Sequence, residues 1–338
     1  TKAAIKGRGT YYCKKCQKTR RYMIKWGIIG AGNIAHRFCR ALAKDKGAKL
    51  EAVSCRTMEK AKAFKMIYPC NKAYDSFQKI LDDPDIEAVY IALPHYYHYE
   101  WIKKAILAHK SVLVEKPATI DYRQMEELRA LAKQEKVLLM EAMKNRFVPC
   151  YQKAKDLLDN QIIGDIKKIE TSFCNEHMEY DANCYLFDLK QGGCLLDLGI
   201  YNISYLDDFF NNELSDLSLE CRYHECGVDS YVNAKIVFGE KIGIVECAID
   251  HKKESCVVFS GEKGKMILKP LHRPLYIKVI LNDKTVIDEH IDYENDDFYS
   301  EIVHFNSLIE NHQLESNIMS LDSSVNCAKI LSAIKERL

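Results

Sequence analysis

The stretch IKWGIIGAGNIAHRF, at residues 24–38, decides the fold of this chain. Its first six residues are mostly apolar and include β-branched side chains, which is typical of a buried strand. The turn GAGNIA follows, and apolar side chains then recur every four residues at Ile34, Phe38 and Leu42, the spacing of a helix. A strand, a glycine turn and a helix in this order predict a phosphate-binding βα unit.

The small residues of this turn each have a physical role in binding a dinucleotide. Gly30 permits the tight turn, Gly32 lets the backbone approach a pyrophosphate, and Ala35 keeps the helix close to the strand. The helix N-terminus, at Asn33 and Ile34, presents free N–H groups to the anion. We therefore predict a cofactor site at Gly30, Gly32, Asn33 and Ile34. The alternative is an ordinary strand-to-helix turn.

Size and charge limit the classes of function. With 338 residues the chain is long enough for two domains. Its 49 Lys and Arg balance 48 Asp and Glu, so no net field attracts a nucleic acid or an anionic membrane. No apolar run approaches the roughly 18 residues of a membrane span, and there is no apolar signal segment. The 14 cysteines are scattered, which favours reduced thiols in a cytoplasmic protein.

Residues 1–22 are basic and differ in pattern from the rest of the chain. Their stretch GRGTYYCKKCQK resembles the last hairpin of the zinc finger of formamidopyrimidine-DNA glycosylases. A structural zinc needs four ligands, and no second C-x-x-C accompanies Cys13 and Cys16. We expect an extraneous extension without a metal site, with the functional chain starting at Met23. The alternatives are a zinc shared between chains, a redox pair or a nucleic-acid module, against which the balanced charge argues.

From Met23 onward, strands and helices alternate. We expect strands at 49–54, 86–93, 111–114 and 137–142, with helices between them that Ser76 and Asp121 cap. Such repeats predict a parallel sheet whose ligand binds at the C-terminal strand ends. The predicted cofactor-binding residues at these ends are Leu93, Pro94, His95, His98, Glu115 and Lys116.

The second predicted strand ends in Ser54-Cys55-Arg56. An NAD site usually has an acid near this position, about 20 residues past the glycines, to bind the adenosine ribose. Here Arg56 stands instead, and a guanidinium suits a 2′-phosphate. We predict NADP as the cofactor, with NAD as the alternative; Arg56 as a solvated surface residue is the competing interpretation.

The second half of the chain changes pattern. Strands are indicated at 164–174, 219–226, 230–238, 242–250, 255–260, 264–269 and 275–281, and apolar helix faces at 296–312 and 322–337. A run of strands after βα repeats predicts a separate α+β domain with a large, mostly antiparallel open sheet. The fold class is thus α/β, with a dinucleotide-binding domain at 23–143 and a substrate domain at 144–319.

Five segments carry a family resemblance: GIIGAGNIA, YIALPHYYHYE, VLVEKP, MEAMKNRFVP and GGCLLDLGIY. In this order they resemble the glucose–fructose oxidoreductase / inositol dehydrogenase (Gfo/Idh/MocA) family, and most of all its dihydrodiol and NADP-dependent xylose dehydrogenase branch. The resemblance implies a homodimer or homotetramer formed through the open sheet, and a last helix, 320–338, that returns to the cofactor domain. It implies hydride transfer between a nicotinamide cofactor and a hydroxyl or carbonyl of a sugar, polyol or diol.

The chain departs from the family pattern at several positions. His95 stands where many members have Asn, and His109 where a helix-ending Gly is usual. Tyr201 replaces the His of inositol-type members, as in the diol and xylose branch. Residues 271–274 lie where many relatives carry a Trp, so the resemblance does not define the substrate rim.

The resemblance further implies that Lys116, Asp197 and Tyr201 meet at the substrate. A free Tyr has a pKa near about 10, and the Lys116 ammonium and an oxidised nicotinamide would favour tyrosinate. We predict Tyr201 as general acid/base, Lys116 as electrostatic tuner and hydroxyl donor, and Asp197 as the group that orients both. Lys116 as the proton carrier is the alternative.

Further candidates for the substrate pocket are Asn145, Arg146, Glu176 and His177. The competing function is a non-catalytic, NADP-binding sensor on the same fold. The intact Lys116, Asp197 and Tyr201 set favours the enzyme, because a sensor could lose it freely.

Overall fold

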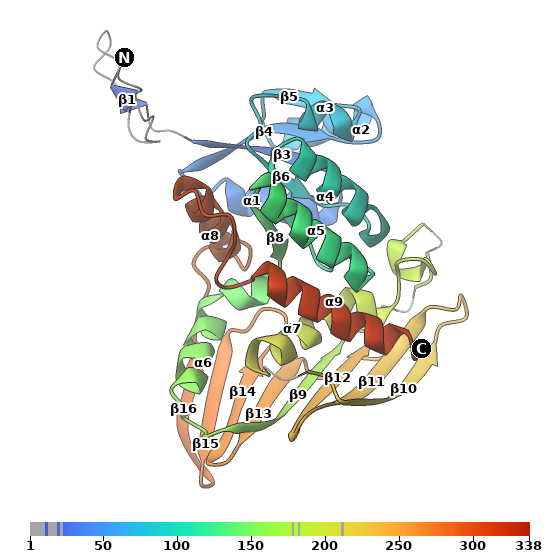
Figure 1. The fold of residues 1–338 in the computed structure, drawn as a ribbon, viewed down its shortest axis with the longest axis vertical. Helices are drawn as coiled ribbons and strands as arrows, with labels where there is room; N and C mark the ends of the chain where they lie inside the picture. The colour runs from blue at the N-terminus through green and yellow to red at the C-terminus, as the bar shows by residue number, and fades with distance from the viewer. Residues whose placement is uncertain (1–10, 13–18, 21–22, 178, 182, 211–212) are drawn as a thin grey trace.

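The computed structural model describes residues 11–12, 19–20, 23–177, 179–181, 183–210 and 213–338. Figure 1 shows a smaller sheet and a larger sheet at opposite ends of the molecule, with helix α9 (Leu321–Lys335) between them. The predicted fold class is confirmed: one sheet is parallel and the other mostly antiparallel.

The smaller sheet has six parallel strands in the order β5-β4-β3-β6-β7-β8. They span β3 (Ile24–Ile29), β4 (Ala48–Ser54), β5 (Lys72–Tyr74), β6 (Ala88–Ile91), β7 (Ser111–Glu115) and β8 (Leu139–Ala142). The side chains of Trp26, Ile28 and Ile29 on β3 are fully buried, as expected for a strand covered by helices on both faces.

Helices connect these strands and carry the predicted caps. They are α1 (Asn33–Leu42), α2 (Met58–Ile67), α3 (Phe77–Leu81), η1 (His95–Tyr97), α4 (His98–Leu107) and α5 (Tyr122–Glu135). Ser76 accepts a hydrogen bond from the Gln78 N–H, and Asp121 accepts one from the Arg123 N–H, which confirms both predicted N-caps.

The larger sheet has eight strands in the order β10-β11-β12-β9-β13-β14-β15-β16. They span β9 (Ile166–Cys174), β10 (Asp216–Tyr223), β11 (Asp229–Phe238), β12 (Lys241–Ala248), β13 (Cys256–Gly261), β14 (Gly264–Lys269), β15 (Tyr276–Leu281) and β16 (Lys284–His290). Among these strands β9 and β12 run parallel, whereas the other neighbours run antiparallel. Burial alternates along β11, so one face of the sheet packs on the core.

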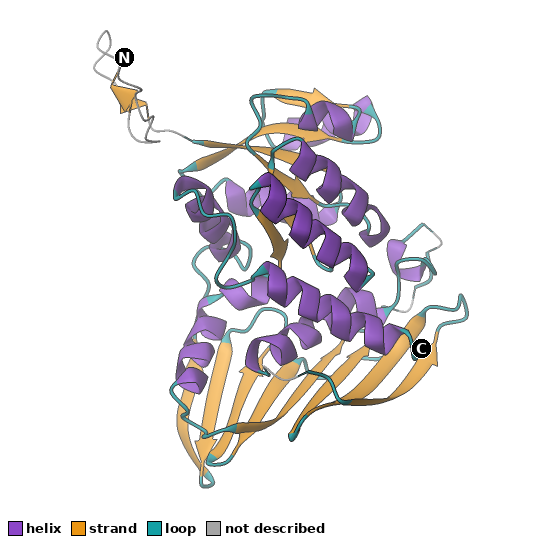
Figure 2. Ribbon diagram, viewed as in Figure 1, coloured by secondary structure: helices purple, strands orange, loops and turns teal. Residues whose placement is uncertain are grey.

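The remaining helices are η2 (Lys144–Phe147), α6 (Pro149–Asp159), η3 (Tyr185–Phe187), the π-helical turn η4 (Leu195–Gly199), α7 (Ile200–Phe209) and α8 (Tyr299–Glu310). Of these, α6, η4 and α7 contact strands of the larger sheet, whereas α8 contacts α1 and η2. Figure 2 shows the other face of the larger sheet without helices.

Two helices from the end of the chain pack onto the first sheet. The indole N–H of Trp26 on β3 donates to Asn306 Oδ1 on α8 at 3.0 Å. Helix α9 contacts both α5 and α7, and Arg129 of α5 pairs with Asp322 of α9 at 2.6 Å. The last helix therefore lies against the first part of the chain.

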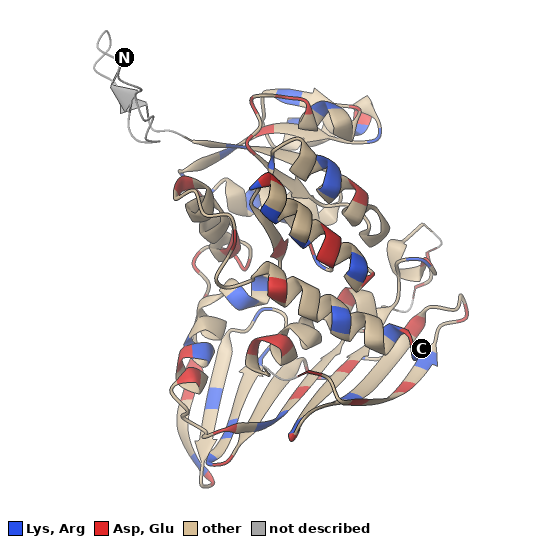
Figure 3. Cartoon of the chain, in the orientation of Figure 1, with Lys and Arg blue, Asp and Glu red and all other residues tan. Residues whose placement is uncertain are grey.

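Other features of the described chain bear on the sequence-based expectations. Two short strands, Tyr11–Tyr12 and Thr19–Arg20, pair with each other, while Cys13 and Cys16 lie outside the described residues. None of the described helices is long and apolar enough to cross a membrane, and no group of three or more metal-ligating side chains is found in the same residues. Figure 3 shows both signs of charge interspersed along the molecule in this view.

Candidate active site

The glycine turn has the geometry that its sequence predicts. Gly30 has φ +93°, and a Cβ there would lie 2.6 Å from the main-chain oxygen of Ala92, so this position requires glycine. A Cβ on Gly32 would meet nothing within 4 Å. Helix α1 begins after Gly32 without a side-chain cap, so its first N–H groups are free to bind an anion.

This contrast between the two glycines predicts separable effects. We expect Gly32→Ala to leave the melting temperature unchanged but to weaken NADPH binding roughly 10- to 100-fold, because a methyl group would block charge-assisted hydrogen bonds to the pyrophosphate. Gly30→Ala should lower the melting temperature instead, through its left-handed backbone. Fluorescence titration and thermal unfolding of both variants check this, and equal NADPH affinity of Gly32→Ala and wild type would contradict it.

The glycine turn opens into a pocket of about 480 Å³ between the two sheets. Its lining includes most of the predicted cofactor and catalytic residues: Gly32, Asn33, Ile34, Leu93, Pro94, His95, Glu115, Lys116, Asp197 and Tyr201. Arg37, Ala92 and Tyr185 also line it. Residues separated by more than 160 positions in sequence therefore share one cavity, which is the usual setting of an active site.

Lys116 and Asp197 make a direct ion pair in this pocket. The Lys116 ammonium donates to the main-chain oxygen of Asp197 at 2.7 Å and to its Oδ1 at 3.1 Å. Burial alone would raise the pKa of Asp197, but the Lys116 ammonium and a hydrogen bond from Tyr185 hold it below its ordinary value. Asp197 is therefore a carboxylate that fixes the lysine.

Tyr201 lies directly beside this pair. The Lys116 ammonium is 4.9 Å from the centre of the Tyr201 ring. Burial, together with the charges of Glu115 and Asp197, raises the pKa of Tyr201 well above its ordinary value. These protein groups favour the protonated phenol, which suits proton donation to a carbonyl, and they oppose the predicted shift towards tyrosinate.

Asp197 and Tyr201 were predicted to share one helix, and the structure refines this. Asp197 lies in the π-helical turn η4, and Tyr201 lies in the first turn of α7. The Leu195 N–H at the start of η4 donates to Asp229 Oδ2 at 2.7 Å. Gly193 has φ +93°, and a Cβ there would come within 1.9 Å of Asp229 Oδ1, which explains why glycine precedes this turn.

The two predicted histidines have different surroundings. His95 lines the pocket and donates its Nδ1–H to the main-chain oxygen of Gln191 at 3.0 Å. Burial, with the positive charge of neighbouring groups, lowers the pKa of His95 to about 3, so it stays neutral. His98 is fully buried behind the pocket, and its two ring nitrogens lie 2.8 Å from the main-chain oxygens of Leu93 and Pro117. It braces these two strand ends rather than facing a cofactor.

Glu115 and Arg56 are placed differently from each other. Glu115 lies in the pocket, accepts a hydrogen bond from the Tyr90 hydroxyl, and has a pKa raised by burial. Arg56 is exposed and outside the pocket lining. The Gly30 N–H, however, donates to the main-chain oxygen of Ser54 at 3.0 Å, so Arg56 follows a strand end that is bonded to the glycine turn.

Sequence reasoning missed three lining residues, Ala92, Arg37 and Tyr185. Arg37 stands three residues after Ile34 on α1, a spacing that placed it on the same helix face; it pairs with Asp297 and lies 4.7 Å from the ring of Phe298. Tyr185 donates its hydroxyl to Asp197 Oδ1 at 3.0 Å, and no periodicity in its irregular segment indicated this.

The weaker candidates do not line the pocket. Arg146 is fully buried, pairs with Asp207 at 2.8 Å and donates to the main-chain oxygen of Ser204, so it joins η2 to α7. Asn145 donates to Ser204 Oγ at 3.1 Å. Both therefore support the core, which corrects the idea that they contact substrate. Glu176 and His177 also lie outside the pocket lining.

The Tyr201 ring also lies near His272, a residue of the segment that departs from the family. His272 stacks on Phe173 with ring centres 4.4 Å apart and lies 6.0 Å from the Tyr201 ring. Its Nδ1 is buried without a hydrogen-bond partner in the described structure. Burial and the nearby Lys144 lower the pKa of His272 to about 3, so this ring is neutral.

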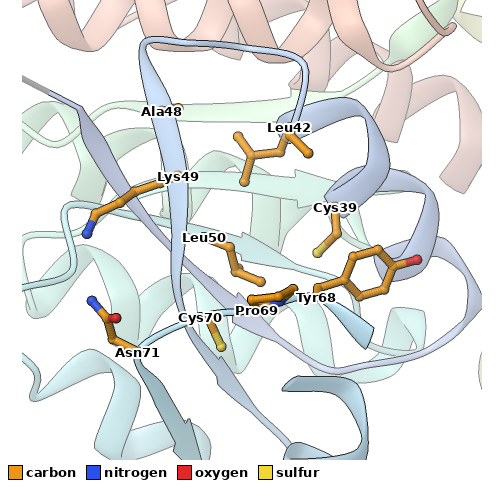
Figure 4. Close-up of a pocket in the computed structure, with 10 residues that line it drawn as sticks. Cys39, Leu42, Ala48, Lys49, Leu50, Tyr68, Pro69, Cys70 and Asn71 are labelled. Atoms are coloured by element: carbon orange, nitrogen blue, oxygen red, sulfur yellow. The ribbon is translucent and has the colours of Figure 1, made fainter. Parts of the chain in front are cut away.

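A second hollow lies away from these residues. Figure 4 shows this pocket, also about 480 Å³, where Cys39 of α1, Leu50 of β4 and Tyr68 and Cys70 line it. Burial raises the pKa of the thiols of Cys39 and Cys70, which makes them poor nucleophiles. None of the predicted site residues lines this hollow.

Two family profiles match the chain. The one described as an oxidoreductase family with an NAD-binding Rossmann fold matches residues 24–143, and the GFO/IDH/MocA C-terminal domain matches residues 151–267. The chain belongs to the GFO/IDH/MocA oxidoreductase family. The resemblance is confirmed, and the chain is an NAD(P)-dependent oxidoreductase with a Rossmann domain.

Relatives of this oxidoreductase cover nearly its whole length. The trans-1,2-dihydrobenzene-1,2-diol dehydrogenase of Xenopus laevis is 32% identical over 326 residues, which are 93% of this chain and 98% of that protein. The human protein of the same name is 27% identical, over 93% and 97% of the two chains.

Two solved structures share the fold. KijD10, a 3-ketoreductase from Actinomadura kijaniata in complex with NADP and TDP-benzene, superposes with a TM-score of 0.82 at 24% identity, over 93% of this chain and 97% of that one. An aldose-aldose oxidoreductase from Caulobacter crescentus, complexed with glycerol, gives 0.83 at 20% identity over the same shares.

Proposed function

We propose that this oxidoreductase transfers hydride between NADP and a hydroxyl or carbonyl of a sugar, polyol or diol. The observation that carries the proposal is the Lys116–Asp197 ion pair beside the Tyr201 ring, in the same cavity as the glycine turn. The named relatives act on a diol, a ketone and an aldose, which supports this substrate class.

The residues present fit a dinucleotide. Open space over Gly32 and the uncapped start of α1 suit a pyrophosphate, and the pocket continues from there to Lys116 and Tyr201. When bound, the nicotinamide supplies the hydride acceptor or donor. We assign its neighbourhood to Leu93, Pro94, His95 and Glu115; these contacts remain predictions.

The chain's own residues then handle the oxygen and its proton. The Lys116 ammonium has three N–H groups, of which Asp197 takes up two, so one is free for the reacting oxygen. The Tyr201 hydroxyl gives its proton to that oxygen when a carbonyl is reduced and takes it back when an alcohol is oxidised. Asp197 holds the lysine in place. These roles are our assignment, with Lys116 as proton carrier the alternative.

We assign the NADP preference to Arg56. If its guanidinium binds the 2′-phosphate, Arg56→Ala should weaken NADPH binding roughly 10- to 100-fold, the range for charge-assisted hydrogen bonds, and change NADH binding little. Fluorescence titration with both nucleotides measures this. Arg123→Ala, which removes an exposed arginine at the start of α5, is the matched control. Equal loss of NADPH and NADH affinity, or no loss, would contradict the assignment.

We further propose that the enzyme works in the cytoplasm as a homodimer or homotetramer. All cysteines of the described residues are unpaired, which suits a reducing compartment. On the outer face of the larger sheet the partly buried side chains Ile244, Val258 and Ile267 lie in one row, with Glu170 of β9 between the first two. A second sheet covering this row would bury it. Light scattering of the purified protein tests the assembly.

The direct test is a turnover screen. Purified protein with NADP⁺ is assayed against trans-diols, aldoses and polyols, and with NADPH against the matching carbonyl compounds. Oxidation of at least one such compound is expected. Tight NADPH binding without turnover of any of these compounds would favour a non-catalytic sensor, an alternative that no structural observation supports.

A further inference from the structure

The segment between β9 and η4 brings Tyr185 to the mouth of the active-site pocket. Its hydroxyl donates to Asp197 Oδ1 at 3.0 Å, and its ring lies edge-on to His95 with centres 5.2 Å apart. Although it lines the pocket, Tyr185 is 38% exposed. It therefore stands where a substrate enters, with its polar end inside.

The turn η3 is anchored by the two residues that follow Tyr185. These neighbours, Leu186 and Phe187, are buried and hold the turn. Phe187 contacts the rings of Tyr180 and His224 at 5.3 and 5.0 Å. An exposed aromatic side chain on a turn that is anchored by its neighbours is a better candidate for binding than for packing.

Gln191 is the second residue that anchors the segment between β9 and η4, and it bonds this segment to the cofactor domain. Gln191 accepts hydrogen bonds from His95 Nδ1 at 3.0 Å, through its main-chain oxygen, and from the Tyr96 N–H at 3.0 Å, through Oε1. Tyr185 is thus held between the two sheets before any substrate binds. A pre-positioned hydroxyl binds with little ordering cost.

The hydroxyl of Tyr185 and the ammonium of Lys116 share one acceptor. Both contact Asp197 Oδ1, at 3.0 and 3.1 Å, so they lie within two hydrogen-bond lengths of each other. A reacting oxygen on Lys116 therefore has a second polar group close by. The two oxygens of a vicinal diol in its gauche form are about one hydrogen-bond length apart, so one of them can contact Lys116 while the other reaches the Tyr185 hydroxyl.

We propose that Tyr185 is a specificity-determining residue that binds the hydroxyl on the carbon next to the reacting one. The Tyr185 O–H donates a hydrogen bond to Asp197, and its oxygen accepts one from that neighbouring hydroxyl. Lys116 and Tyr201 hold the reacting oxygen. The substrate class is then a compound with adjacent oxygens: a vicinal diol, an aldose or an α-hydroxyketone. This inference rests on the proposed function and deepens it.

The test compares wild type, Tyr185→Phe and the control Tyr180→Phe with NADP⁺ and two alcohols, trans-cyclohexane-1,2-diol and cyclohexanol. Tyr180 lies on the same segment but outside the pocket lining. In Tyr185→Phe we expect the KM for the diol to rise about tenfold, the loss of one hydrogen bond to substrate. The preference for the diol over cyclohexanol should fall with it, and Tyr180→Phe should match wild type.

Two results would overturn the inference while leaving the proposed function intact. Tyr185→Phe with the diol KM and preference of wild type would show that the hydroxyl binds no substrate. A loss confined to kcat and equal for both alcohols would make Tyr185 only a support for Asp197. If the wild type binds NADPH but oxidises neither these alcohols nor any compound of the turnover screen, the proposed function itself fails and the inference with it.

Discussion

Tyr201→Phe is expected to lower kcat about 10²- to 10⁴-fold, the usual contribution of a positioned acid or base. The phenol lies beside the Lys116 ammonium and is the group to which we assign the proton transfer, and phenylalanine preserves its packing. NADPH binding should be retained, since the glycine turn is untouched. Steady-state kinetics and a fluorescence titration measure the two effects.

The matched control lies one helical turn further along α7. Tyr205 is fully buried and donates its hydroxyl to the main-chain oxygen of Leu271 at 2.7 Å. Tyr205→Phe should cost about 1 kcal/mol of unfolding free energy, from one hydrogen bond, and keep the wild-type kcat. If Tyr201→Phe kept its rate while Lys116→Met lost it, the lysine would be the proton carrier.

Arg146→Met is expected to destabilise the fold by about 3–5 kcal/mol, the cost of breaking a buried ion pair on one side. The guanidinium is 0% exposed and holds Asp207 on α7, Ser204 on the same helix and Ser323 on α9. Methionine fills similar volume but leaves the Asp207 carboxylate buried without its counter-charge. Urea unfolding measures the loss.

A surface pair supplies the comparison for this change. Arg222 makes a bidentate contact with Asp250 at 2.8 and 3.0 Å, but its side chain is 53% exposed. Arg222→Met should cost less than about 1 kcal/mol. If the two variants lost similar unfolding free energy, burial of the Arg146 ion pair would not increase the cost of breaking it, and the prediction would be wrong.

The local sequence pattern predicted the structure correctly at positions where a residue type has a single physical role. The glycine turn, the N-caps and the strand ends are such places, and even the departure at His109 was visible, since this residue takes φ +53° where glycine is usual. Strand β16 was missed because its exposed residues, KTVIDEH, lack a buried face. Its pairing with β15, not its own pattern, makes it a strand.

The site was harder to predict than the fold because its geometry is long-range. Lys116, Asp197 and Tyr201 were found through family order, not through spacing. Tyr185 and Arg37 belong to no such motif. Tyr185 lies in an irregular segment, and the sequence does not distinguish Arg37 from an arginine on the surface of a helix. His98 and Arg146 were predicted to lie near the cofactor or substrate, because histidine and arginine often serve in catalysis. In the structure their polar groups are instead bonded to buried partners. Burial is a property of the whole chain, so no local pattern shows it.

The position of β9 has a consequence for how the larger sheet assembles. This strand comes first in the chain but lies in the middle of the sheet, between β12 and β13. Strands β10 to β12 and β13 to β16 can form hairpins with their sequence neighbours as they are synthesised. Strand β9 cannot pair until its partners β12 and β13, from Lys241 onward, have left the ribosome. Pairing over such a sequence distance is slow, although the entropy of closing the longer loop grows only slowly. During that interval both long edges of β9 are unpaired, so this strand is the point at which nascent chains are most exposed to aggregation.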